Sequence, residues 1–126
     1  FWRPITAIRA AAADGNVATA PDPGWVPLLD TPPVQDYPST HSVAGAAAAF
    51  VLASALGDVS DFSVTSSTAE DPGQARSFRR FSEAANENSD SRVRAGIHFR
   101  FAVDAGAAMG NRVGEQAYNG QLRRAP

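Results

Sequence analysis

The sequence contains neither cysteine nor lysine, and it carries no large excess of either charge. Without cysteine there can be no disulfide, thiolate metal site or cysteine nucleophile, and the redox compartment stays undetermined. All eleven basic residues are arginine, and the formal net charge is −2. Such a chain offers no basic field for a nucleic acid or an anionic membrane. We therefore expect neither partner.

Long apolar runs are also missing, since no stretch approaches the roughly 18 residues that span a bilayer. The start of the chain lacks the charged and apolar regions of a signal peptide. The chain is therefore expected to be soluble. Its 126 residues fit one domain. Because the first residue is Phe1 and not methionine, we expect residues 1–126 to be a single domain that is truncated at its N-terminus.

Two segments in the first half of the chain favour helices. Residues 1–13 favour a short helix that has Pro4 in its first turn, where proline is tolerated. Residues 40–56 are rich in Ala, Val and Leu and are followed by Gly57, a common helix-ending residue. Ser39 stands at the N-cap position. We predict a buried helix from about 40 to 56.

Two further helical regions follow in the second half. Apolar residues at intervals of three and four predict a helix from about 76 to 90, and residues 91–118 are expected to form one or two core helices. The tail from residue 119 to 126 is expected to fray. Three small residues in the last helical region would let helices approach closely: Gly106, Ala108 and Gly110. The predicted fold class is all-α.

Two stretches do not favour helices. Residues 14–38 hold six of the nine prolines, which predicts a long, ordered loop that packs on the domain. Residues 58–73 carry turn-forming residues and are expected to be a loop or a short extended piece. The expected apolar anchors of the proline-rich loop are Trp25, Val26, Leu28 and Leu29.

Arginine, serine and histidine gather at the ends of the predicted helices. The clusters are Arg3-Pro4, Pro38-Ser39-Thr40-His41, and Ser91-Arg92 with His98. Arginine donates several charge-assisted hydrogen bonds to a tetrahedral oxyanion, and a helix N-terminus adds backbone N–H groups and partial positive charge. Both histidines of the chain lie in these clusters. Taken singly, each arginine could be a surface residue, each histidine a packing residue, and Ser39 only an N-cap.

In this order the clusters resemble the signature of the superfamily that joins type 2 phosphatidic-acid phosphatases, bacterial acid phosphatases and vanadium haloperoxidases. That signature has a Lys, six residues and Arg-Pro; then Pro-Ser-Gly-His; then Ser-Arg, five residues, His, three residues and Asp. The resemblance spans nearly the whole chain. Three segments of the sequence look like the soluble bacterial haloperoxidase-like branch: residues 1–4, 22–25 and 96–101.

The resemblance implies a helical bundle of the vanadium chloroperoxidase and acid phosphatase type, with vanadate as cofactor. It assigns Arg3 and Arg92 to the equatorial oxygens of the anion, and Ser39 and the Thr40 backbone to further hydrogen bonds. It makes His98 the vanadium ligand, or the phosphorylated nucleophile of a phosphatase. It makes His41 the acid–base group, a role that an imidazole with a pKa near 6.5 can perform.

Three departures from the signature are visible. Its Lys would stand upstream of Phe1, seven positions before Arg3. Thr40 replaces the Gly, which bears on how closely the backbone can approach the anion. Ala102 stands where the final Asp is expected, and Asp104 is off the helical face that would replace it. Loss of this carboxylate favours a haloperoxidase over a phosphatase. Three aspartates of the proline-rich region are interpreted as turn formers: Asp22, Asp30 and Asp36.

The function implied is a vanadate-dependent haloperoxidase, which oxidises halide with hydrogen peroxide to hypohalous acid. One alternative is an acid-phosphatase-type phosphomonoesterase that forms a phosphohistidine and takes a phosphate ester as substrate. Another is a non-catalytic helical module that binds only an oxyanion. The halide and the compartment stay open, although family resemblance is compatible with a secreted or periplasmic protein, and a homo-oligomer is also compatible with the sequence.

Overall fold

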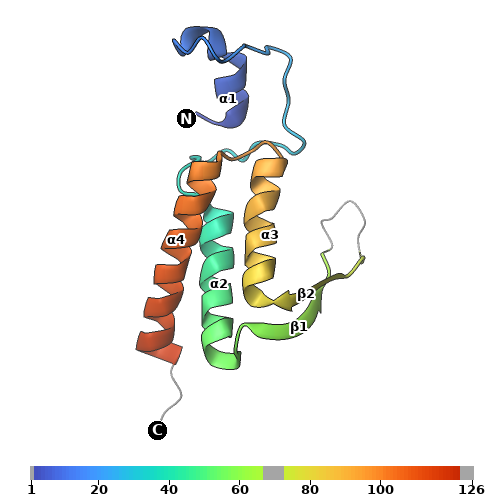
Figure 1. Cartoon of the computed structure of the whole chain (residues 1–126), viewed down its shortest axis with the longest axis vertical. Coiled ribbons are helices and arrows are strands. Elements are labelled where there is room, and N and C mark those ends of the chain that lie inside the picture. The colour runs from blue at the N-terminus through green and yellow to red at the C-terminus, as the bar shows by residue number, and fades with distance from the viewer. Residues whose placement is uncertain (1, 67–72, 123–126) are drawn as a thin grey trace.

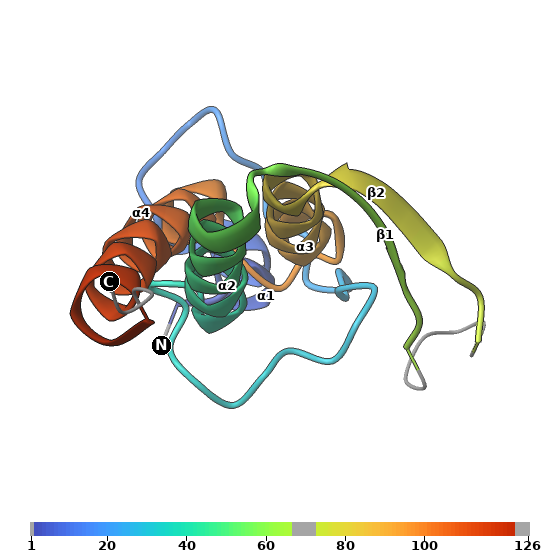
Figure 2. The same cartoon turned by 90° about the horizontal axis from the view of Figure 1, so that it is seen from below.

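Three long helices form the body of the computed structural model, which describes residues 2–66 and 73–122. They are α2 (Thr40–Leu56), α3 (Phe81–Arg94) and α4 (Arg100–Ala117). Helix α2 stands between the other two (Figures 1 and 2). Because α2 and α4 run in the same direction and α3 runs opposite to them, the start of α2, the end of α3 and the start of α4 lie at one end of the bundle (Figure 1).

The boundaries of α2 agree with the sequence prediction. Gly57 follows its last residue at φ +88°, a conformation that favours glycine. Ser39 occupies the N-cap position, but its side chain makes no capping hydrogen bond. The predicted burial is only partly correct. Ser42 and Ala46 are buried, whereas Leu56 keeps 66% of its surface exposed.

Helices α2 and α4 pack closely because glycines line their contact. A Cβ at Gly106 would lie 2.6 Å from the Ser39 carbonyl oxygen, and one at Gly110 would collide with the carbonyl oxygen of Val43. The prediction that these two glycines permit close approach is confirmed. Ala108 is exposed and takes no part in it. Gly114 extends the same stripe toward the C-terminal end of α4.

A small antiparallel hairpin corrects the all-α prediction to a mainly helical fold. Its strands are β1 (Val59–Val64) and β2 (Arg76–Arg80), so the predicted short extended piece exists. The helix expected from residue 76 begins only at Phe81. The spacing of Phe78 and Phe81 suggested one helical face, but Phe78 instead pairs across the hairpin with Phe62, with ring centroids 5.5 Å apart.

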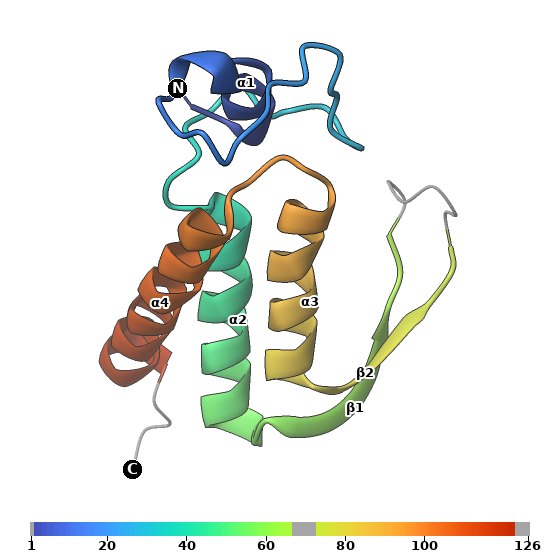
Figure 3. The ribbon, with the colours of Figure 1, turned by 45° about the horizontal axis from the view of Figure 1, so that its top comes forward.

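The N-terminal segment crosses the end of the bundle where α2 and α4 begin (Figure 3). It contains α1 (Pro4–Arg9), which has Pro4 in its first turn as predicted, and a short 3₁₀ turn, Ala11–Ala13. At the other end of the chain, a π-helical turn covers Tyr118–Leu122, where fraying was expected. The rest of that predicted tail, 123–126, lies outside the described residues. Within the described ranges, no helix is both long and apolar enough to cross a membrane.

The proline-rich loop docks on the turn between α3 and α4. Leu28 N–H donates to the carbonyl of Ala95 at 3.0 Å. Trp25 lies so close to Gly96 that a Cβ there would be 2.7 Å from its ring. Trp25 is therefore an anchor, as predicted. The prediction of three further anchors was wrong, because their side chains are exposed: Val26, Leu28 and Leu29.

Candidate active site

The fold brings all three sequence clusters to the same end of the bundle. Ser39 precedes α2, Arg92 lies in the last turn of α3, and His98 lies in the turn before α4. Arg3 precedes α1, which sits above this end (Figures 1 and 3). Chain segments far apart in sequence therefore contribute to one site because three helix ends meet there.

A tight turn places His98 over the end of α3. Gly96 adopts φ +73°, and the backbone N–H of His98 then donates to the Arg92 carbonyl at 3.3 Å. Only 3% of His98 is exposed. Burial lowers the pKa of His98, and the positive charge of Arg3 lowers it further, while Asp36 opposes the shift. The lowered pKa favours the neutral form of the ring, the form that can ligate a metal.

Arg3 is buried and binds mainly backbone carbonyls. Its Nε donates to Val34 at 3.1 Å, and Nη1 donates to Ile97 at 2.6 Å. Nη2 donates to Val34 at 2.7 Å and to Gln35 at 3.2 Å. Nη1 also lies 3.1 Å from His98 Nε2. The structure therefore brings Arg3 to the site, but its clamping of an anion stays a prediction.

Asp36 is the site residue that sequence reasoning missed. It is only 6% exposed, and its Oδ1 lies 3.0 Å from His98 Nδ1 and 3.6 Å from Arg3 Nη1. The interpretation as a turn former overlooked this burial. The available signal was its place three residues before Ser39, inside a segment already assigned to the site.

Several buried donors lack partners among the described residues. At this end of the bundle they include the hydroxyls of Ser39 and Ser42, both fully buried, and the Nε–H of Arg92. An unsatisfied buried polar group costs about 1–3 kcal/mol, so such groups need an explanation. A hydroxyl and a guanidinium N–H are the donors that an oxyanion accepts from. The residues present therefore fit a vanadate or phosphate group.

Ser39 is fixed by its neighbours on α4. Its backbone N–H donates to the Ala102 carbonyl at 2.9 Å, and Gly106 leaves room for its own carbonyl. Since its side chain does not cap α2, the hydroxyl stays available for another partner. Thr40, the first residue of α2, is exposed. Its backbone N–H belongs to the first helical turn, which has no intrahelical acceptor.

His41 is exposed, in contrast to His98. Partial desolvation lowers the pKa of His41, and the charge of Arg92 lowers it further. The charge of Arg92 also lowers the pKa of His98. Burial lowers the pKa of Arg92 itself, and the charge of Arg3 lowers it further. His41 lies in the first turn of α2 and Arg92 in the last turn of α3, so both belong to the same end of the bundle as Arg3 and His98. The second imidazole faces solvent, where it can exchange protons.

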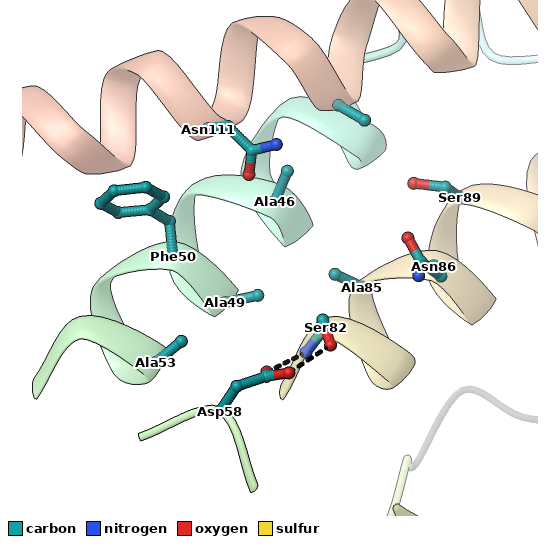
Figure 4. Close-up of a pocket in the computed structure, with 11 residues that line it drawn as sticks. Ala46, Ala49, Phe50, Ala53, Asp58, Ser82, Ala85, Asn86, Ser89 and Asn111 are labelled. Carbon is teal, nitrogen blue, oxygen red and sulfur yellow. Dashed lines mark hydrogen bonds between the residues drawn. The ribbon is translucent and has the colours of Figure 1, made fainter. Parts of the chain in front are cut away.

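A separate cavity of about 240 Å³ lies among α2, α3 and α4 (Figure 4). Five of its eleven lining residues are alanines, and Asn86 and Asn111 are among the others. At its edge Asp58 accepts hydrogen bonds from the backbone and hydroxyl of Ser82, at 2.9 and 2.7 Å. None of the predicted site residues lines this cavity, so it is distinct from the candidate site.

Comparison with known families decides the assignment. The model of the VCPO second helical-bundle domain matches residues 1–124. The chain belongs to the vanadium haloperoxidase superfamily. The resemblance seen in the sequence is thereby confirmed at the level of the superfamily. No curated protein matches the chain.

Solved structures of bacterial vanadium haloperoxidases share this fold. A bacterial vanadium-dependent iodoperoxidase superposes with a TM-score of 0.77 at 35% identity, over 93% of this chain and 26% of its own. A bacterial vanadium-dependent chloroperoxidase in its holo form gives 0.71 at 21% identity, over 93% of this chain and 29% of its own. The chain thus spans less than a third of the length of these solved haloperoxidases.

Proposed function

We propose that this chain forms the anion-binding end of a vanadate-dependent haloperoxidase, which oxidises halide with hydrogen peroxide to hypohalous acid. The observation that carries the proposal is the group of unpartnered buried donors, which includes Ser39 Oγ and Arg92 Nε, at the end of the bundle that holds the buried His98. The haloperoxidase relatives favour this chemistry over other uses of an oxyanion site.

Three residues would hold the vanadate in this proposal. His98 would ligate it through a ring nitrogen, while Arg92 and Ser39 would donate hydrogen bonds to its oxygens. Bound vanadate supplies the Lewis acid that activates hydrogen peroxide. Burial of Ser39 and His98 keeps water from these contacts, and in such a site fixed donors are worth more than in water.

His41 is the proton-exchanging group of the proposal. One halide, one hydrogen peroxide and one proton give one hypohalous acid and one water, so the reaction consumes a proton. His41 lies in the first turn of α2, next to Ser39 and exposed to solvent, from which it can be reprotonated. Its lowered pKa makes proton release easier near neutral pH.

The earlier preference for a haloperoxidase because of the missing carboxylate no longer holds. Asp36 brings a carboxylate to His98 from the proline-rich loop. Such a carboxylate would equally serve a phosphohistidine-forming phosphatase. The choice between the two reactions therefore depends on the haloperoxidase relatives and on experiment.

The test uses the protein as it is naturally expressed. We expect vanadate-dependent oxidation of a halogen acceptor, abolished in His98→Ala. Arg92→Ala should weaken vanadate binding about tenfold to a hundredfold, because a charge-assisted hydrogen bond is lost. Arg94→Ala is the matched control, since Arg94 is exposed in the same helical turn. It should bind vanadate normally.

Other outcomes select the other functions. Full peroxidase activity without vanadate would contradict the proposal. Phosphate release from a monoester, inhibited by vanadate and without peroxidase activity, would identify the phosphatase. Binding of phosphate or vanadate without either activity would identify the non-catalytic module.

A further inference from the structure

Asp36 is a buried carboxyl group that faces the ring of His98 and the guanidinium of Arg3. The Oδ1–Nδ1 distance of 3.0 Å is within hydrogen-bond range, and neither oxygen of Asp36 has a hydrogen-bond partner among the other described residues. A buried carboxyl group is costly unless it is paired, so the place of Asp36 needs a partner to explain it. Arg3 is the second neighbour, at 3.6 Å, but backbone carbonyls already accept from all three of its nitrogens.

The carboxylate of Asp36 favours one tautomer of His98. A carboxylate only accepts hydrogen bonds, so the nitrogen that faces it, Nδ1, carries the proton. Arg3 Nη1 lies at nearly equal distances from the two ring nitrogens, 3.1 Å from Nε2 and 3.3 Å from Nδ1, so Asp36 alone distinguishes the two tautomers. Nε2 therefore offers its lone pair. An imidazole ligates a metal through the nitrogen that is not protonated.

We propose that Asp36 is the positioning residue for His98, holding the ring by Nδ1 and leaving Nε2 as the ligating nitrogen. The family signature implies a carboxylate at the position of Ala102, which is fully buried and carries none. Asp36 supplies it instead from the proline-rich loop, a different part of the chain. Only the identity of the ligand at Nε2 rests on the proposed function; the tautomer does not.

The tautomer is measured without any ligand, by ¹⁵N NMR of protein labelled at histidine. The chain has two histidines, so His41→Gln assigns the signals. In the natural sequence, neutral His98 should be protonated at Nδ1. Asp36→Ala should shift it toward the Nε2-protonated form. Asp36→Asn should fall between them, because its amide oxygen can still accept from Nδ1. Asp30→Asn, at an exposed position of the same loop, should change nothing.

Anion binding supplies a second readout. Vanadate affinity should fall about tenfold to a hundredfold in Asp36→Ala, the usual effect of removing the partner of a ligating histidine. Inorganic phosphate affinity should stay the same or rise, because phosphate needs no bond to Nε2 and a negative charge has been removed. A merely structural role of Asp36 would weaken both anions together.

Several outcomes would overturn the proposal. It is wrong if His98 of the natural sequence is protonated at Nε2, a result that needs no variant and holds even if Asp36→Ala fails to fold. It is also wrong if Asp36→Asn leaves the tautomer and the vanadate affinity unchanged, or if both anions lose affinity equally. Failure of the proposed function looks different: the natural protein would not bind vanadate, while His98 would still be protonated at Nδ1.

Discussion

Replacing Gly106 with alanine should both loosen the contact between α2 and α4 and disturb the candidate site. A Cβ at this position would lie 2.6 Å from the Ser39 carbonyl oxygen and 3.0 Å from Ser42 Cβ. Backbone atoms cannot rotate away from such a collision, so the two helices must move apart. Ser39, whose hydroxyl is one of the unpartnered donors, would move with the start of α2.

The expected size of the effect follows from two opposing contributions. Overpacking a close contact costs about 1–3 kcal/mol. Alanine is favoured over glycine in a helix by about 1 kcal/mol. Because the nearest atom at Gly106 is a backbone oxygen well inside contact distance, we expect the upper part of the overpacking range. The free energy of unfolding should therefore fall by about 1–2 kcal/mol.

Gly114→Ala is the matched control, because its Cβ would lie 2.7 Å from the Ala47 carbonyl oxygen at the far end of the same contact. Urea unfolding should show a similar loss of stability in both variants, and inorganic phosphate binding should weaken only in Gly106→Ala. Gly120→Ala, with no atom within 4 Å of the new Cβ, should leave both properties near those of the natural sequence.

Two results would refute this reasoning. If Gly106→Ala is as stable as the natural sequence, helix propensity outweighs the collision and the helices are not held as closely as the structure shows. If both variants weaken phosphate binding equally, the site does not depend on the position of Ser39.

Three further predictions concern the loop and the titrating groups. Gly96→Ala should lower the free energy of unfolding by at least about 1–2 kcal/mol because of the left-handed backbone, and it should shift the fluorescence of Trp25. Gly15 has a similar φ but open space around it, so Gly15→Ala should lose only the backbone contribution. Equal losses of stability in the two variants would show that Trp25 does not dock on Gly96. Because burial lowers the pKa of His98, the folded protein binds fewer protons than the unfolded chain, and its stability should fall as the pH drops below about 6.5. In His98→Gln the midpoint of urea unfolding should depend less steeply on pH. Hydrogen bonds from Ser82, in the first turn of α3, lower the pKa of Asp58. Asp58→Ala should therefore be less stable than the natural sequence above pH about 3.9, and this difference should vanish as the pH falls through the lowered pKa. Circular dichroism during an acid titration measures both.

Local patterns in the sequence sufficed to predict part of the helical framework. The bounds of α2 could be predicted because its apolar run is closed by Gly57, whose positive φ ends the helix by local chemistry alone. Pro4 marked the first turn of α1 for the same kind of reason. The start of α3 could not be predicted, because the choice between strand and helix at Phe78 depends on Phe62 across the hairpin.

The sequence alone determined which residue types could bind an oxyanion, and their ordered spacing identified the superfamily. Only the tertiary structure decided how they meet. Arg3 turned out to bind backbone carbonyls, because the proline-rich loop wraps around its side chain. Asp36 became a site residue because that loop carries it to His98, an encounter between distant segments that no local pattern encodes. Hydrogen bonds and burial of single side chains depend on such long-range contacts, whereas helix ends depend on neighbours in sequence.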